Sequence, residues 1–106
     1  MTKVSFEKYG DKISKLVVSG HSGYSEEGSD IVCAAVSSSV NLAASVLDCG
    51  GAEFSLNVGK RRTTLILEVD DGELGQTVMK ALVKELSALS ADFPENVKVT
   101  AAERIR

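Results

Sequence analysis

The stretch LGQTVMKALVKELSALSADF, residues 74–93, shows the clearest periodicity in this chain of 106 residues. Its large apolar residues recur every three or four positions, which is the spacing of one face of an α-helix. The stretch predicts an amphipathic helix that starts near Asp71 and stops at Pro94. The residues that form its apolar face are Leu74, Val78, Leu82, Leu86, Leu89 and Phe93.

A second helix is predicted from about Asp30 to Asp48, where the sequence is rich in alanine and serine. Ser29 or Asp30 is placed to cap its start, and Gly50 and Gly51 follow its end. The small side chains favour close packing against a sheet or another helix. Its larger apolar residues at near-helical spacing are Val32, Val36, Val40 and Leu47.

The remaining segments alternate polar with apolar residues, which is typical of strands with one buried face. Residues 4–6 and 13–18 predict one hairpin, residues 52–58 and 63–69 a second one, and Val97 and Val99 a final strand. The predicted order is strand, strand, helix, strand, strand, helix, strand. The expected fold is therefore α+β: a two-layer sandwich with two main helices packed on a mostly antiparallel sheet.

Length and composition predict a single globular domain, residues 1–106, with 43% hydrophobic and 25% charged residues. The net charge of −3 argues against a surface built to bind nucleic acid. The basic run Lys60-Arg61-Arg62 is interpreted as a solvated hairpin tip. The N-terminus lacks the apolar core of a signal peptide, and we expect no run of membrane-spanning length. A cytoplasmic location, with reduced thiols, is expected.

The chain's only histidine, His21, and the first of its two cysteines, Cys33, lie within GHSGYSEEGSDIVCAAVS, residues 20–37. Cys33 is expected in the first turn of the second predicted helix, where free backbone N–H groups favour a thiolate. His21 follows the end of a predicted strand and is placed to act as a base. The same N–H groups would stabilise the oxyanion of a tetrahedral intermediate. This arrangement predicts a cysteine nucleophile with a histidine base.

The same residues also have a purely structural interpretation, and spacing alone leaves both open. A helical cysteine beside Ile31 and Val32 is typical of a small buried hydrophobe, and a single histidine near a turn is typical of a solvated loop. In this interpretation Asp30 caps the helix and Ser37 packs one turn beyond Cys33 on the same face.

Several other kinds of site fail on the residues present. Cys33 and Cys49 would stand about 24 Å apart along one helix, too far for an intrachain disulfide. Two cysteines and one histidine are too few for a typical four-ligand zinc site. Ser22 in GHSGY is no nucleophile elbow, because Tyr24 stands where that motif needs glycine and no histidine follows.

The glycine–histidine pair, the glycine-bearing loop and DIVCAAVS together closely resemble the bacterial ribosomal-processing cysteine proteases (Prp). The resemblance implies that His21 is the catalytic base and Cys33 the nucleophile. It also implies that Gly20, Asp30 and Ser37 support the site or touch the substrate. Members of that family need no metal or organic cofactor.

The same resemblance implies a substrate and an assembly. The family removes the N-terminal extension of a large-subunit ribosomal protein, cutting after an aromatic residue that is followed by a basic segment. Its members are homodimers. The acidic residues of segment 26–30 suit such a basic peptide, whereas a membrane or nucleic-acid partner is not expected.

Two alternatives belong to other classes of function. One is a non-catalytic ribosome-associated binding module that uses Lys60-Arg61-Arg62 and the acidic loop as contacts. Its binding would survive Cys33→Ala and depend strongly on salt. The other is a redox-sensing thiol at Cys33, for which the chain offers no nearby second cysteine.

Overall fold

The computed structural model describes residues 1–20, 27–59 and 64–103, and the side chains of residues 27–30 lie outside the described part. Within these ranges the order of elements is the predicted one. The strands and helices are β1 (Thr2–Tyr9), β2 (Lys12–Ser19), α1 (Glu27–Cys49), β3 (Phe54–Val58), β4 (Leu65–Val69), α2 (Glu73–Asp92) and β5 (Val97–Glu103).

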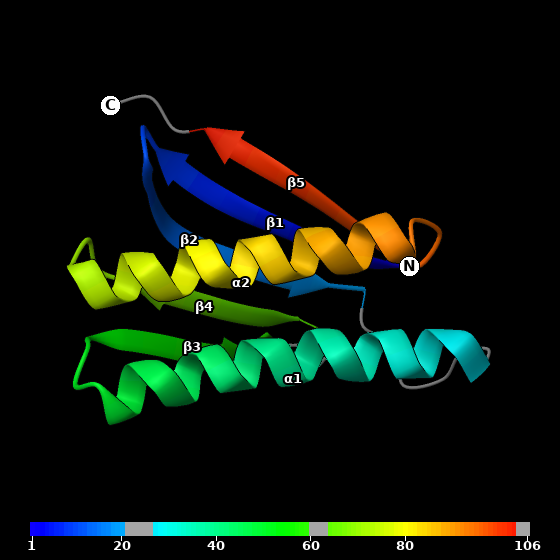
Figure 1. The fold of residues 1–106 in the computed structure, drawn as a ribbon, viewed down its shortest axis with the longest axis horizontal. Helices are drawn as coiled ribbons and strands as arrows, with labels where there is room; N and C mark the ends of the chain where they lie inside the picture. Colours follow the sequence, from blue (N-terminus) through cyan, green and yellow to red (C-terminus); the bar gives the residue numbers. More distant parts are fainter. Residues whose placement is uncertain (21–26, 60–63, 104–106) are drawn as a thin grey trace.

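The strands form one sheet in the order β3-β4-β2-β1-β5, and both helices cross the same face of it (Figure 1). Strand β1 pairs antiparallel with β2 and parallel with β5, while β4 pairs antiparallel with β2 and with β3. The predicted α+β two-layer architecture with a mostly antiparallel sheet is confirmed. The parallel pairing of β1 with β5 requires the long crossover through α2.

The core lies between the sheet and the helix layer. Apolar residues on the helix-facing side of the sheet form rows across the strands: Leu56 pairs with Leu67, Leu67 with Leu16, and Leu16 with Phe6. All four large apolar residues predicted for the second helix are buried. Of the six residues of the 74–93 stripe, Val78, Leu82 and Leu86 are buried and Leu89 is half-buried. The ends of that stripe, Leu74 and Phe93, are exposed, and Phe93 lies just past the last residue of α2.

Helix α1 ends where the two glycines predicted it would. The backbone N–H of Ala52 donates to the carbonyl of Leu47, and that of Gly51 donates to the carbonyl of Asp48. Gly51 has a φ of +73°. This pair of bonds across a left-handed residue is the Schellman ending of a helix.

The start of α1 differs from the prediction. The helix begins at Glu27, so Ser29 and Asp30 lie inside its first turn and do not cap it. The first four residues of a helix, here 27–30, are those whose N–H groups lack a helical partner. Acidic residues in this turn, such as Asp30, are favourable next to the positive end of the helix dipole.

A buried amide fixes the start of α2 to the sheet. The side chain of Gln76 accepts a hydrogen bond from the N–H of Ile13 at 2.7 Å and donates to the carbonyl of Ile13 at 2.8 Å. It also donates to the carbonyl of Asp70 at 3.0 Å. Residue pairing between β2 and β4 reaches only Lys15 and Glu68 on this side. Strand β4 therefore provides no backbone partner opposite Ile13, and the side chain of Gln76 makes the two hydrogen bonds to Ile13 in its place.

The stretch Ile31–Cys49 of α1 is long and apolar enough to cross a membrane by length and composition alone. The expectation that no run reaches that length is therefore wrong. The stretch carries the residues Val36, Val40 and Leu47, each with 0% of its side chain exposed. These side chains belong to the core between α1 and the sheet. The apolar character of α1 is therefore explained by its place in the core.

Candidate active site

Cys33 lies on α1, six residues after the helix begins at Glu27. The prediction that it occupies the first turn is wrong, because the helix starts three residues earlier than the sequence pattern indicated. At 1.5 Å per residue, Cys33 lies about 9 Å along the axis from the helix start. The free N–H groups of the first turn therefore belong to residues 27–30, and the helix dipole acts on Cys33 from a greater distance than expected.

The thiol of Cys33 is buried, with 7% of the residue exposed, and has a hydroxyl partner. Its Sγ lies 3.2 Å from Oγ1 of Thr2, and either atom can be the donor. Thr2, at the start of β1, is 1% exposed. The two residues lie 31 positions apart in the sequence, so the contact joins the helix layer to the sheet.

Main-chain contacts from two neighbouring segments hold the start of β1. The N–H of Thr2 donates to the carbonyl of Asn96 at 2.8 Å, just before β5 begins. On the other side, Lys3 pairs with Ser19 at the end of β2, which places Gly20 beside Met1 and Thr2. Thr2 is therefore held between Asn96, the last residue before β5, and Gly20, the residue that follows β2.

Gly20 occupies a position that a larger residue would disturb. Its φ is +75°, and a Cβ built on it would lie 2.5 Å from the backbone oxygen of Met1. Real Cβ atoms essentially never approach a neighbour closer than 3.0 Å. The close passage of Gly20 against Met1 sets where the chain leaves β2 on its way to position 21.

The other predicted site residues are placed to different degrees. Ser37 lies one helical turn after Cys33 and is half-buried. Asp30 belongs to the first turn of α1, and its side chain lies outside the described part. His21 also lies outside the described residues, so its proposed pairing with Cys33 stays a prediction.

Thr2 is the residue that the sequence reasoning missed. A signal for it existed, because Val4 and Phe6 alternate on the buried face of the first strand and position 2 continues that alternation. A polar residue on a buried strand face needs a hydrogen-bond partner. What the sequence did not contain was the identity of that partner, since the contact with Cys33 arises only when α1 packs on β1.

The second cysteine stands apart from this site. Cys49 is the last residue of α1 and is exposed, and both cysteines are free. The uninterrupted helix between them confirms that they cannot bridge. Within residues 1–20, 27–59 and 64–103, no three His, Cys, Asp or Glu side chains gather in a way that could hold a metal ion.

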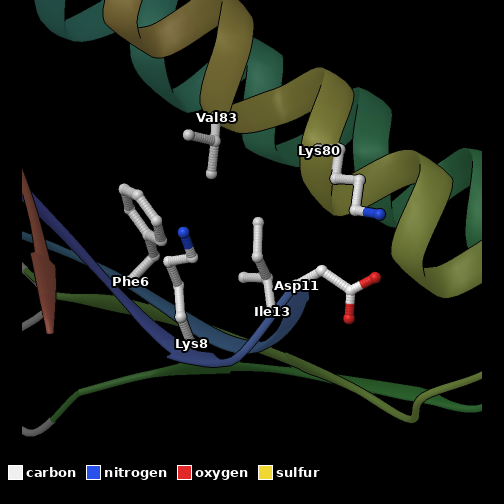
Figure 2. Close-up of a pocket in the computed structure, with 6 residues that line it drawn as sticks. All are labelled: Phe6, Lys8, Asp11, Ile13, Lys80 and Val83. Carbon is white, nitrogen blue, oxygen red and sulfur yellow. The ribbon is translucent and has the colours of Figure 1, made fainter. Parts of the chain in front are cut away.

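The described residues also line two hollows away from Cys33. One, of about 340 Å³, runs between α1 and α2 on the outer side of the helix layer, where Leu42 is 66% exposed and Val46 is 43% exposed. The other, of about 310 Å³, lies between the β1–β2 hairpin and α2 (Figure 2). Its lining residues are Phe6, Lys8, Asp11, Ile13, Lys80 and Val83.

The hollow of Figure 2 is separate from the thiol. Lys8 on its rim stands six residues along β1 from Thr2, which is about 20 Å at the rise of a strand. Figure 2 shows the side chains of Phe6 and Ile13 rising from the hairpin toward Val83 on the helix. Cys33 therefore lies at the opposite end of β1.

Comparison with known proteins gives one family and one fold. The family model described as cysteine protease Prp matches residues 1–98. The essential ribosomal processing protease Prp from S. aureus, in complex with a substrate peptide, has a similar structure. Its TM-score is 0.87 at 17% identity, over 96% of this chain and 100% of that chain.

Two further solved structures agree. A protein from Streptococcus mutans has a TM-score of 0.88 at 22% identity, over 98% of this chain and 99% of that chain. The S. aureus protease with a covalently linked product peptide has a TM-score of 0.82 at 19% identity, over 96% of this chain and 100% of that one. No curated protein matches the sequence. At these identities the structural matches establish the fold.

Proposed function

The chain belongs to the Prp family of cysteine proteases, and we propose from this premise that it is a site-specific endopeptidase. Its proposed substrate is the N-terminal extension of a large-subunit ribosomal protein, cut after an aromatic residue. The observation that carries the proposal is the family match over residues 1–98, a range that includes both His21 and Cys33. The S. aureus ribosomal processing protease Prp, which has the same fold, has been solved with a substrate peptide and with a covalently linked product peptide.

The proposed mechanism uses Cys33 as nucleophile and His21 as general base. His21 takes the thiol proton, and the sulfur of Cys33 attacks the scissile carbonyl carbon to give a tetrahedral oxyanion. Collapse of this intermediate breaks the C–N bond, while the protonated imidazole gives its proton to the departing amine. Water, activated by the neutral imidazole, then hydrolyses the thioester and restores the free thiol.

The surroundings of Cys33 support a nucleophile with a fixed direction. The residue is 7% exposed, lies on a long helix and has the Thr2 hydroxyl 3.2 Å from its sulfur. Catalysis requires the attacking atom to be held in place before the substrate arrives. Residues packed on a helix and a strand hold an atom more firmly than residues of a free loop.

The proposed partners follow the family. The acidic residues of segment 26–30 would attract the basic part of the peptide behind the cut. A second copy of the chain is proposed to complete a homodimer, and the apolar groove around Leu42 and Val46 is the surface we propose for it. A cytoplasmic location is proposed because ribosomal proteins are assembled there and thiols stay reduced there.

Cleavage of the extended ribosomal protein from the same bacterium, followed by mass spectrometry, tests the proposal. The wild type and Cys49→Ala should produce one cut after an aromatic residue. Cys33→Ala and His21→Ala should leave the substrate intact. Cys49→Ala is the matched control, because it removes the exposed thiol at the other end of the same helix. A substrate that Cys33→Ala still cuts at the same bond would contradict the proposal.

Thiol labelling gives a second and independent test. Cys33 is buried and Cys49 is exposed, so accessibility alone predicts that an alkylating agent modifies Cys49 faster. An activated nucleophile reverses this order at neutral pH, because the thiolate and not the thiol reacts. Replacing His21 should then slow the labelling of Cys33 and leave that of Cys49 unchanged. Labelling in the order of exposure would count against an activated Cys33.

The binding-module alternative is distinguished by the same variants. It predicts that an intact ribosomal protein is bound, and that Cys33→Ala binds it as tightly as the wild type does. Its basic contact, Lys60-Arg61-Arg62, lies outside the described residues. Loss of binding on neutralising the acidic loop, with the basic run intact, favours recognition of a basic peptide over recognition of a phosphate backbone.

A further inference from the structure

Thr2 is a buried polar residue whose hydroxyl points at the proposed nucleophile. It is 1% exposed, and its Oγ1 lies 3.2 Å from Sγ of Cys33. A hydroxyl removed from water costs free energy unless it keeps a hydrogen-bond partner. Valine or isoleucine would fill a buried strand position without this cost. The presence of threonine is therefore explained by its bond with the sulfur.

The position of this hydroxyl is fixed by main-chain contacts. The N–H of Thr2 is bonded to the carbonyl of Asn96, and the neighbouring residues of β1 pair with β2 and β5. Threonine is branched at Cβ, so its χ1 angle is restricted once the backbone is set. The Oγ1 atom therefore keeps its direction toward Cys33 without relying on a flexible side chain.

We propose that Thr2 is a positioning residue for Cys33, which holds the sulfur in place and donates a hydrogen bond to its thiolate. In the neutral pair either atom can donate. Once the thiol has lost its proton, the sulfur can only accept, so the hydroxyl must donate. A bond to a charged acceptor is about twice as strong as one between neutral groups. The contact thus stabilises the charged form of the nucleophile more than the neutral one.

This bond acts where the helix dipole is weak. Cys33 lies six residues beyond the start of α1 and is only 7% exposed, so little water can solvate its sulfur. A donor from the sheet replaces part of the solvation that water would otherwise provide. When the sulfur becomes acylated it loses its charge, and the hydroxyl returns to a weaker neutral contact.

Two measurements test this proposal. The measurement of peptide cleavage rests on the proposed function, whereas the measurement of Cys33 alkylation does not depend on it. Thr2→Val removes the hydroxyl and keeps the branched shape, and Thr2→Ser keeps the hydroxyl and removes the methyl group. The rate of Cys33 alkylation is measured against pH by mass spectrometry, with Cys49 in the same chain as internal standard. Urea unfolding of each variant identifies a loss of fold.

With Thr2→Val, the pH midpoint of Cys33 alkylation should rise, and kcat/KM for peptide cleavage at neutral pH should fall about tenfold, the effect of one hydrogen bond to a charged group. Thr2→Ser should restore both to within about threefold of the wild type. The labelling of Cys49 should not change. A purely structural role predicts equal losses for the two variants and no movement of the midpoint.

The outcomes separate the two proposals. A midpoint that Thr2→Val leaves in place, in a folded protein, overturns the role of Thr2 even if the peptide is cut normally. A midpoint that moves in Thr2→Val and returns in Thr2→Ser, in a protein that cuts no peptide, supports the role of Thr2. That second result would overturn the proposed peptidase instead.

Discussion

Replacing Gly20 by alanine should damage both stability and activity, and the chain offers a matched control. Gly20 and Gly10 both have positive φ, +75° and +59°. A Cβ at Gly10 would meet nothing within 4 Å, whereas a Cβ at Gly20 would lie 2.5 Å from the backbone oxygen of Met1. Gly10→Ala therefore measures the cost of the left-handed backbone alone, and Gly20→Ala measures that cost together with the contact.

The expected magnitudes follow from these two contributions. A non-glycine residue in the left-handed region costs about 1–2 kcal/mol, and this is the loss expected for Gly10→Ala. Overpacking adds about 1–3 kcal/mol, so Gly20→Ala should lose about 2–5 kcal/mol of unfolding free energy. To restore even the 3.0 Å limit, the backbone of Met1 must move by 0.5 Å, the difference between 3.0 and 2.5 Å.

The displaced residue is the neighbour of Thr2, so the movement reaches the bond to Cys33. A shift of this size should lower peptide cleavage about tenfold, because misplacement by a full ångström costs about a hundredfold. Urea unfolding gives the two free energies, and cleavage and Cys33 alkylation give the activity. The reasoning is refuted if Gly20→Ala is as stable and as active as Gly10→Ala.

Two further predictions concern the start of α2 and the apolar groove. Gln76→Leu should lower the free energy of unfolding by about 2–4 kcal/mol, because it leaves the buried N–H and C=O of Ile13 without their partner. Ser87→Leu, at an exposed position of the same helix, should change it by less than about 0.5 kcal/mol, and equal effects of the two would contradict the role given to Gln76. Leu42→Lys should convert the proposed dimer into a monomer in sedimentation without loss of fold, because it places a charge in the apolar groove. A dimer that survives the change would place the interface on another surface.

The periodicity of apolar residues was sufficient to predict the helices and strands of this fold. It was not sufficient to predict which strands pair with one another. The four-residue spacing of Val78, Leu82 and Leu86 predicted α2, and these residues are buried. Val97 and Val99 predicted a strand, but nothing in them indicated a parallel partner. That choice is made by the crossover of α2, which returns the chain to the far side of β1.

The start of α1 was misjudged for a physical reason. Ser29 and Asp30 are good capping residues, and Gly28 is a poor helix former, so local propensity favoured a start near position 30. The structure extends the helix back to Glu27. The local helix propensity of residues 27–30 was thus overridden in the folded protein. Because the helix starts earlier than expected, Cys33 does not lie in its first turn.

The candidate site could be predicted in part. The motif around Cys33 carries enough information to indicate a family, which the match over residues 1–98 confirms. The contact with Thr2 could not be predicted, because it joins residues 31 positions apart through the packing of a helix on a sheet. Sequence patterns report the face on which a residue lies, and they do not report which residue of another element it meets.

The parallel pairing of β1 with β5 links this site to the order in which the chain is synthesised. Thr2 is translated long before Asn96, yet its N–H is bonded to the carbonyl of Asn96, just before the last of the described strands. Contacts distant in sequence form late, because the intervening chain must first be closed into a loop. While β5 is missing, β1 is an edge strand and its first residues lack one of their two neighbours. A nascent chain would then carry the thiol without its completed surroundings, so the proposed nucleophile would become competent only after β5 has been translated.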